Sequence, residues 1–371
     1  MSPWKAAQPG DPLSRVDTPA LVLDLDAFER NLQRMADAVR GSKVRLRAHA
    51  KSHKCPEIAR RQLALGATGI CCQKVSEAAV FVDAGVEDIL ITNQVVGDAK
   101  LVRLMALAKR ARMGVLVDHP AQLHALASAA RAAQAALDVY VEVDVGSGRC
   151  GVPPGLAAIR LAELAADSSP LRFAGLHCYH GRAQHLRTPA ERAAAITYAV
   201  VAAAETRAAI EARGIPVPIV TGAGTGTFMH ERDSGVFNEI QAGSYIFMDR
   251  DYADNQRSSR DIVFEHALFV RSTVMSRPSA LRAVVDAGLK ASSVDSGMPG
   301  IWQRPELRYL KAADEHGLIG SEQGAAPALG ETLMLIPGHC DPTVNLYDEL
   351  VCYRGETVEA VWPIAARGAL L

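Results

Sequence analysis

Eight residues near the start of the chain, Arg47 to Lys54, hold two lysines, two histidines and one arginine. They follow the short run from Val44 to Leu46, at a point where a strand should pass into a helix. A lysine crowded by other cations is a candidate for a lowered pKa, which an amine needs to form a Schiff base with a carbonyl. A solvated basic loop would have the same composition. The rest of the chain must therefore decide between the two interpretations.

A regular alternation of segments must position this stretch. Short apolar runs predict strands at residues 44–48, 68–71, 88–92, 113–117, 137–143, 173–178, 217–221 and 237–241. Ala-rich or amphipathic segments between them predict helices at residues 56–65, 75–84, 99–111, 120–132, 156–166 and 190–212. Eight strands joined in this way favour a closed (β/α)8 TIM barrel over an open, doubly wound sheet.

The pattern changes after about residue 255. Strand-like runs at residues 264–275, 281–285, 331–335, 349–353 and 358–362 are separated by Gly, Pro and Asp turns, which predicts a mostly β domain. The strand-like run at residues 18–25 is a candidate to pair into this domain. A helix should begin at Asp26, with Glu29 as its capping-box partner. We therefore expect a barrel over residues 26–255 and a β domain made of residues 1–25 and 256–371.

Composition excludes several classes of function. The 371 residues carry a net charge of −1, so nothing indicates a nucleic-acid or membrane-surface partner. No apolar stretch reaches the length of a membrane span, and the polar N-terminal segment lacks the apolar region of a secretory signal. Seven cysteines without a CxxC pair are typical of a reduced, cytoplasmic protein.

Polar and glycine-rich residues follow the predicted barrel strands. After the seventh strand comes the run from Gly222 to Thr227, and Gly243 and Ser244 follow the eighth. Glycines let backbone N–H groups surround a phosphate, and barrels often bind phosphate at these two loops. An ordinary glycine turn stays possible, and a Rossmann motif is disfavoured because the GxGxxG spacing is missing. A phosphate cradle together with a reactive lysine points to pyridoxal phosphate. A Schiff-base aldolase acting on sugar phosphates would need the lysine near the sixth strand.

Ten segments between residues 14 and 368 resemble the alanine-racemase-like, fold type III pyridoxal-phosphate enzymes, and within them the branch of D-threonine aldolases and D-serine dehydratases. They include TPALVLDLDAFERNL, RAHAKSHKCPEIA, VEVDVGSGRCGV, TGAGTGT, EIQAGSYIFMD and PGHCDPTVNLYD. The resemblance implies that Lys51 forms the Schiff base with the cofactor, that Arg149 contacts its phenolic oxygen and that Tyr179 lines it. It places Gln241 where racemases have an arginine against the pyridine nitrogen. It also implies a phosphate site formed by Gly222, Gly224, Thr225, Gly226, Gly243 and Ser244.

His339 and Asp341 form a second motif, within Pro337–Pro342. In an extended segment residues i and i+2 share a face, so both could bind one ion while Cys340 points away. The resemblance implies a divalent metal here, with His-x-Cys in the dehydratases and His-x-Asp in the aldolases. The harder pair in this chain favours Mn²⁺ or Mg²⁺ over Zn²⁺.

The resemblance implies a pyridoxal-phosphate- and metal-dependent retro-aldol cleavage of D-3-hydroxy-amino acids, with D-threonine giving glycine and acetaldehyde. His185 is then a candidate general base for the substrate hydroxyl. His49 and His53 are either partners that tune Lys51 or structural histidines. Alternatives on the same fold are a D-serine or D-3-hydroxyaspartate dehydratase and a 3-hydroxyaspartate aldolase. A pyridoxal-phosphate-binding regulatory protein without turnover is a further alternative. The resemblance also implies a homodimer.

Overall fold

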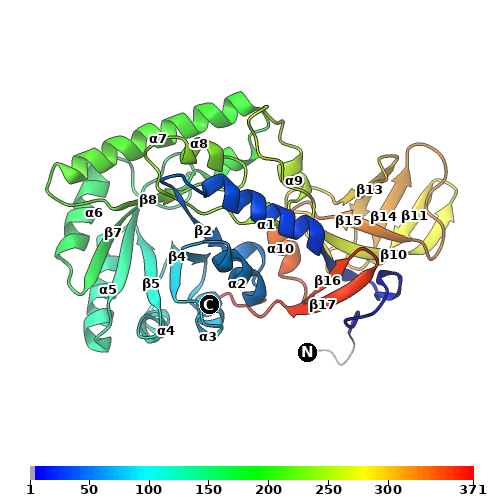
Figure 1. The fold of residues 1–371 in the computed structure, drawn as a ribbon, viewed down its shortest axis with the longest axis horizontal. Helices are drawn as coiled ribbons and strands as arrows, with labels where there is room; N and C mark the ends of the chain where they lie inside the picture. Colours follow the sequence, from blue (N-terminus) through cyan, green and yellow to red (C-terminus); the bar gives the residue numbers. More distant parts are fainter. Residues whose placement is uncertain (1–4) are drawn as a thin grey trace.

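Two sheets organise the chain, and the computed structural model describes them over residues 5–371 (Figure 1). The first is a closed barrel of eight parallel strands. Its strands are β2 (Arg45–His49), β3 (Gly69–Cys72), β4 (Asp88–Gln94), β5 (Arg112–Val117), β6 (Leu137–Glu142), β7 (Leu171–Cys178), β8 (Ile219–Gly222) and β9 (Glu239–Ile240). The predicted barrel is thus confirmed, and each predicted strand overlaps an observed one.

Helices cover the outside of the barrel. They are α2 (Pro56–Ala64), α3 (Val75–Asp83), α4 (Asp98–Ala108), α5 (Pro120–Ala133), α6 (Leu156–Asp167), α7 (Pro189–Glu211) and α8 (Phe228–Arg232). Successive residues of a strand point to opposite faces, and β3 shows this clearly. Ile70 and Cys72 pack in the large core shared with the helices, whereas Cys71 lies in a small cluster with inward residues of other barrel strands. The barrel interior is therefore filled, and chemistry is left to its ends.

Helix α7 is long and apolar enough to cross a membrane by length and composition alone, although no apolar stretch of that length was expected from the sequence. It connects the parallel strands β7 and β8 and buries Ala199, Ala203 and Ile210 in the barrel core. Tyr198 and Val201 of the same helix are exposed. Packing on the barrel therefore accounts for part of its apolar surface.

The second sheet has the strand order β13-β14-β11-β10-β1-β16-β17, with β15 paired to β10 and to β12. The strands are β1 (Ala20–Asp24), β10 (Leu268–Ser279), β11 (Arg282–Val285), β12 (Gly300–Ile301), β13 (Leu307–Ala312), β14 (Gly317–Ser321), β15 (Thr332–Ile336), β16 (Glu349–Arg354) and β17 (Thr357–Pro363). Strand β1 pairs with β10 and β16, as the sequence predicted for this segment. The exact domain limits stay a prediction, and residues 1–4 of the second domain lie outside the described residues.

Helix α1 (Leu25–Val39) connects the two sheets and begins one residue earlier than predicted. Its N-cap is Asp24, whose carboxylate accepts a hydrogen bond of 3.1 Å from the backbone N–H of Ala27. Glu29 does not close a capping box, because with Asp24 as the N-cap the third helical position is Ala27 and not Glu29. The carboxylate of Glu29 instead accepts hydrogen bonds of 3.0 Å from Arg354 of β16.

Six further short helices complete the fold over residues 5–371, and several of them stand near the barrel mouth. They are η1 (Leu13–Arg15), η2 (Ala50–Ser52), η3 (Gly181–His185), η4 (Ser244–Ile246), α9 (Arg250–Ala253) and α10 (Cys340–Val344). Of these, η2, η3 and η4 follow the carboxyl ends of β2, β7 and β9, whereas α10 belongs to the second domain. Contacts between α10 and η2 bring the second domain to the barrel mouth (Figure 1).

Candidate active site

A cavity of about 550 Å³ opens at the carboxyl ends of the barrel strands. Eight of the residues predicted for the cofactor line it, namely Lys51, Arg149, Tyr179, Gly224, Thr225, Gln241, Gly243 and Ser244. The sequence did not assign a cofactor contact to the remaining lining residues, which include Ser52, Gln73, Thr92, His177 and Tyr252. Most of these residues lie within a few positions of the end of a barrel strand, and this position in the sequence could have identified them.

Lys51 stands on η2, directly after β2 ends. The ring nitrogen Nδ1 of His49 accepts a hydrogen bond of 3.3 Å from its backbone N–H, which fixes the turn. Its ammonium group donates to the carboxylate of Asp341, a residue of the other domain. Burial lowers the pKa of Lys51, but the charges of Asp341 and Tyr179 outweigh it and hold the pKa above its ordinary value. The predicted lowering of this pKa was wrong.

The cations around Lys51 do not act on it as the sequence analysis assumed. Burial holds the pKa of His49 well below its ordinary value, and burial lowers the pKa of His53 to about 3. Both rings are therefore neutral at pH 7. Lys54, the second lysine of the stretch, is buried, and its ammonium lies 3.5 Å from the carboxylate of Glu77. Of the two roles weighed for the histidines, His49 touches Lys51, whereas His53 accepts from the backbone N–H of Cys55 at 3.0 Å and serves the local fold.

The loop after β8 and the turn after β9 form a small polar cradle. A Cβ atom at Gly243 would lie 2.7 Å from the backbone carbonyl oxygen of His49, so only glycine fits there. One at Gly224 would lie 2.6 Å from Gln184 Oε1, so a larger residue would have to displace the Gln184 side chain. The buried hydroxyl of Thr225 has no hydrogen-bond partner within residues 5–371. A buried polar atom without a partner is costly, and a phosphate oxygen would satisfy it. This part of the cavity fits the phosphate of pyridoxal phosphate.

Two of the predicted phosphate residues lie elsewhere. Gly222 is the last residue of β8, and a Cβ there would lie 2.4 Å from the carbonyl oxygen of Cys178, so this glycine allows β7 and β8 to approach. Gly226 lines a neighbouring cavity and donates its N–H to Gln184 Oε1 at 3.0 Å. Of the three glycines in the predicted run, Gly224 therefore lines the cavity, whereas Gly222 and Gly226 support the surrounding backbone.

Gln241 faces the cavity from the end of β9 with its amide orientation set by two neighbours. Its Oε1 lies 3.1 Å from His177 Nε2, and its Nε2 donates to Thr221 Oγ1 at 2.8 Å. His177 in turn places Nδ1 3.5 Å from the carboxylate of Glu142. The amide is thus held by a buried polar chain that crosses β6, β7, β8 and β9.

Arg149 lies on the loop after β6, with its guanidinium 5.8 Å from the centre of the Tyr179 ring and 3.6 Å from Glu142. The two predicted cofactor residues are therefore neighbours on one side of the cavity. A cation over an aromatic face is attracted by the ring quadrupole, so Tyr179 also helps to place the guanidinium.

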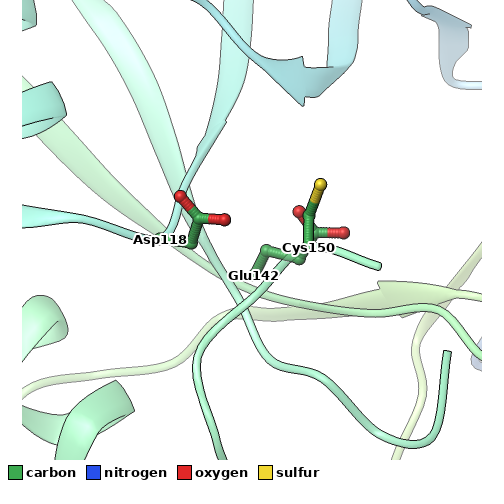
Figure 2. Close-up of side chains that lie close together, drawn as sticks. All are labelled: Asp118, Glu142 and Cys150. Carbon is green, nitrogen blue, oxygen red and sulfur yellow. The ribbon is translucent and has the colours of Figure 1, made fainter. Parts of the chain in front are cut away.

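Asp118, Glu142 and Cys150 gather behind Arg149, with ligand atoms within 4.8 Å of one another (Figure 2). Such a group could hold a metal, but its carboxylates already accept hydrogen bonds. The amide of Gln94 donates to both carboxylates, and the backbone N–H of Gly151 donates to Asp118 at 3.0 Å. The group therefore anchors the loop that carries Arg149.

The predicted metal pair lies at the start of α10. His339 Nε2 is 3.9 Å from Asp341 Oδ2, so the two side chains do meet. The stated reason for their meeting was wrong, because only His339 is extended (φ −142°, ψ 124°), and Asp341 stands in the first turn of the helix. Burial alone would raise the pKa of Asp341, but Lys51 and His339 hold it well below its usual range. The carboxylate is ionised, as a metal ligand must be.

Cys340 does not simply point away from the pair. Its thiol donates to Asp341 Oδ1 at 3.3 Å, and its backbone N–H donates to Asp249 at 3.0 Å. Burial and the neighbouring carboxylates raise the pKa of the thiol well above its ordinary value. Without a metal, Cys340 is therefore a protonated thiol that donates to Asp341.

His185 lies on η3 and does not line the cavity. Its Nδ1 is 2.6 Å from Asp251 Oδ2, and its ring lies 5.3 Å from the ring of Tyr252, which does line the cavity. Donation from Nδ1 to the carboxylate leaves the unshared pair on Nε2. Asp249, at the start of the same short helix α9, accepts from Tyr252 N and Cys340 N at 3.0 Å each. One segment thus holds both His185 and the metal pair.

Comparison with known families agrees with this arrangement. Residues 23–251 match the family model of the alanine racemase N-terminal domain, and residues 267–353 match that of a putative serine dehydratase domain. The chain belongs to the alanine-racemase-like family. The first match covers all strands of the barrel, from β2 to β9. The second match covers the segment with His339 and Asp341.

Members of the alanine-racemase-like family that resemble this chain over nearly its whole length include aldolases. A D-threonine aldolase of Arthrobacter sp. is 51% identical, covering 98% of this chain and 96% of the relative. A 3-hydroxy-D-aspartate aldolase of Paracoccus denitrificans is 42% identical, covering 98% and 95%. The crystal structure of D-threonine aldolase from Filomicrobium marinum superimposes with a TM-score of 0.97 at 53% identity, covering 99% of this chain and all of that one.

Proposed function

We propose that this protein is a pyridoxal-phosphate- and divalent-metal-dependent aldolase that cleaves D-3-hydroxy-amino acids, with D-threonine giving glycine and acetaldehyde. One observation carries the proposal. The ammonium of Lys51 in the barrel touches Asp341 of the second domain, so the amine and the metal pair face the same small volume. The whole-length similarity to two D-threonine aldolases supports the same reaction.

The residues in the cavity fit both groups that this reaction needs. Pyridoxal phosphate supplies an electron sink for the bonding pair released from Cα–Cβ, and a divalent cation supplies a Lewis acid at the β-hydroxyl. Lys51 would hold the cofactor covalently, Thr225 with Gly224, Gly243 and Ser244 would hold its phosphate, and Arg149, Tyr179 and Gln241 would line its ring. His339 and Asp341 would bind the cation, and this harder pair of ligands favours Mn²⁺ or Mg²⁺ over Zn²⁺.

His185 is the group that we propose as general base for the β-hydroxyl. Asp251 fixes its tautomer, and its ring lies 5.3 Å from the ring of Tyr252, which lines the cavity. A His185→Gln variant should therefore lose about 10²- to 10⁴-fold in kcat, the usual contribution of a positioned acid or base. Steady-state kinetics on D-threonine measure this, with His124→Gln on the outer helix α5 as a control. A kcat within twofold of the wild type would remove His185 from the mechanism.

The deciding experiment incubates the purified protein with D-threonine, pyridoxal phosphate and Mn²⁺. We expect equimolar acetaldehyde and glycine. Formation of 2-oxobutyrate without acetaldehyde would contradict the proposal in favour of a dehydratase, and a spectral change of bound cofactor without any product would favour a regulatory protein. Parallel assays with 3-hydroxy-D-aspartate test the preference of the 42% identical relative.

The proposal includes a cytoplasmic location and a homodimer. All seven cysteines are free, which supports a reducing compartment. Sedimentation of the purified protein tests the dimer.

A further inference from the structure

Asp295 contacts the proposed metal ligand His339 from a different loop. It lies in the connection from β11 to β12, and its Oδ2 is 2.9 Å from His339 Nδ1. The contact is on the side of the ring opposite to Asp341, which faces Nε2 at 3.9 Å. The imidazole thus stands between two carboxylates that meet different nitrogens.

The geometry assigns a tautomer to this ring. A neutral imidazole that donates from Nδ1 has its unshared pair on Nε2, the nitrogen nearer Asp341. A carboxylate behind a metal-binding histidine also fixes the ring orientation and makes the ligand more basic. We propose that Asp295 is a positioning residue of the divalent-metal site, which orients His339 so that Nε2 and Asp341 bind one cation. This rests on the metal pair of the proposed function.

Asp295 is itself held in place. Its Oδ1 accepts from Ser293 Oγ at 2.7 Å, and its Oδ2 accepts from Ser296 Oγ at 3.1 Å. The two serines lie close to Asp295 in the sequence, on either side of it. A carboxylate with both oxygens bonded has less freedom to leave the imidazole, so the contact with His339 costs less side-chain entropy than an isolated surface pair.

The loop and α10 are also joined through their backbones. The hydroxyl of Thr343 accepts from the N–H of Ser293 at 3.2 Å and donates to the carbonyl of His339 at 2.9 Å. The phenol of Tyr347 donates to the carbonyl of Ala291 at 2.7 Å. These bonds hold the loop that carries Asp295 against the segment that carries the metal pair.

Close backbone packing confirms that this contact is built into the fold. A Cβ atom at Gly338 would lie 2.1 Å from the carbonyl oxygen of Gly297, so the residue before His339 must be glycine for the loop to approach. An incidental surface ion pair would not need such an approach. The contact between Asp295 and His339 is thus part of the architecture of the site.

The test measures Mn²⁺ affinity on the pyridoxal-phosphate-loaded enzyme by titration after chelation. We expect Asp295→Ala to bind Mn²⁺ about 10- to 100-fold more weakly, the usual cost of losing such a partner. Asp295→Asn should be intermediate, because its amide oxygen can still accept from Nδ1–H. Asp348→Asn is the matched control, since it breaks another exposed ion pair of the same domain, with Arg367 at 2.6 Å, and should leave the affinity unchanged.

Two further readouts separate positioning from a general loss of structure. The melting temperature of the metal-free variants should match that of Asp348→Asn, and saturating Mn²⁺ should restore aldehyde formation by Asp295→Ala. Equal Mn²⁺ affinity in the wild type and Asp295→Ala would overturn the role of Asp295 and leave the metal pair intact. Absence of Mn²⁺ binding by the wild type would overturn the metal pair, and the role of Asp295 with it.

Discussion

A Lys51→Ala variant should release acetaldehyde from D-threonine at least about a thousandfold more slowly than the wild type, an increase of roughly 4 kcal/mol in the activation free energy. The lining of the cavity includes one lysine, Lys51, and its amine donates a hydrogen bond to the carboxylate of Asp341. Without this amine the cofactor has no covalent anchor in the barrel. The backbone of η2 should persist, since the buried Ala50 and Ser52 hold it. Steady-state kinetics on cofactor-saturated protein measure the loss.

Covalent labelling tests the same residue independently of activity. Borohydride reduction of the loaded wild type, followed by peptide mass analysis, should find the cofactor on Lys51, and Lys51→Ala should carry no label. Lys74→Ala is the control, because Lys74 also follows a barrel strand but does not line the cavity. A label on another lysine, or undiminished cleavage by Lys51→Ala, would contradict the assignment.

The architecture of the barrel was predictable because each of its units repeats the same signal. A short apolar strand such as β5 is followed by a helix with a 3.6-residue apolar stripe, and right-handed connection leaves few topologies. The second sheet lacked this redundancy. Strand β13 alternates buried Leu307 and Tyr309 with exposed residues over only a few positions, and β14 (Gly317–Ser321) contains two glycines, so neither was predicted.

The parts of the site that depend on local sequence could be predicted. The parts that depend on contacts between distant residues could not. The lysine and the glycine loop could be found because each stands directly after a strand. The direction of the Lys51 pKa could not, because the deciding charge, Asp341, is 290 residues further along the chain. The contacts that orient His185 and His339 are also made by residues from other elements, Asp251 and Asp295. Electrostatics at a site depends on tertiary contacts, and a one-dimensional pattern does not contain them.

His339→Ala should lose tightly bound metal and fall at least about 10²-fold in kcat/KM for D-threonine, roughly 3 kcal/mol of transition-state stabilisation. His339 and Asp341 are the two proposed ligands, and their side chains lie within 3.9 Å of each other at the barrel mouth. The cofactor cavity contains neither side chain among its lining residues, so cofactor binding should persist. Metal analysis of the purified protein and kinetics over a Mn²⁺ series measure both effects, with His266→Ala as a control for a half-buried histidine of the same domain.

Asp341→Asn should add an effect that His339→Ala lacks. Burial lowers the pKa of Lys51, and the charge of Asp341 is the strongest effect that raises it. Removing this charge should therefore lower the pKa of Lys51. More of the amine is then uncharged at neutral pH, and the metal-free, cofactor-free variant should attach pyridoxal phosphate to Lys51 at a lower pH than the wild type does. The rate of cofactor attachment, followed by absorbance across a pH series, measures this. A pH profile unchanged from that of His339→Ala would show that Asp341 does not set the charge of Lys51, and full metal content in both variants would place the cation elsewhere.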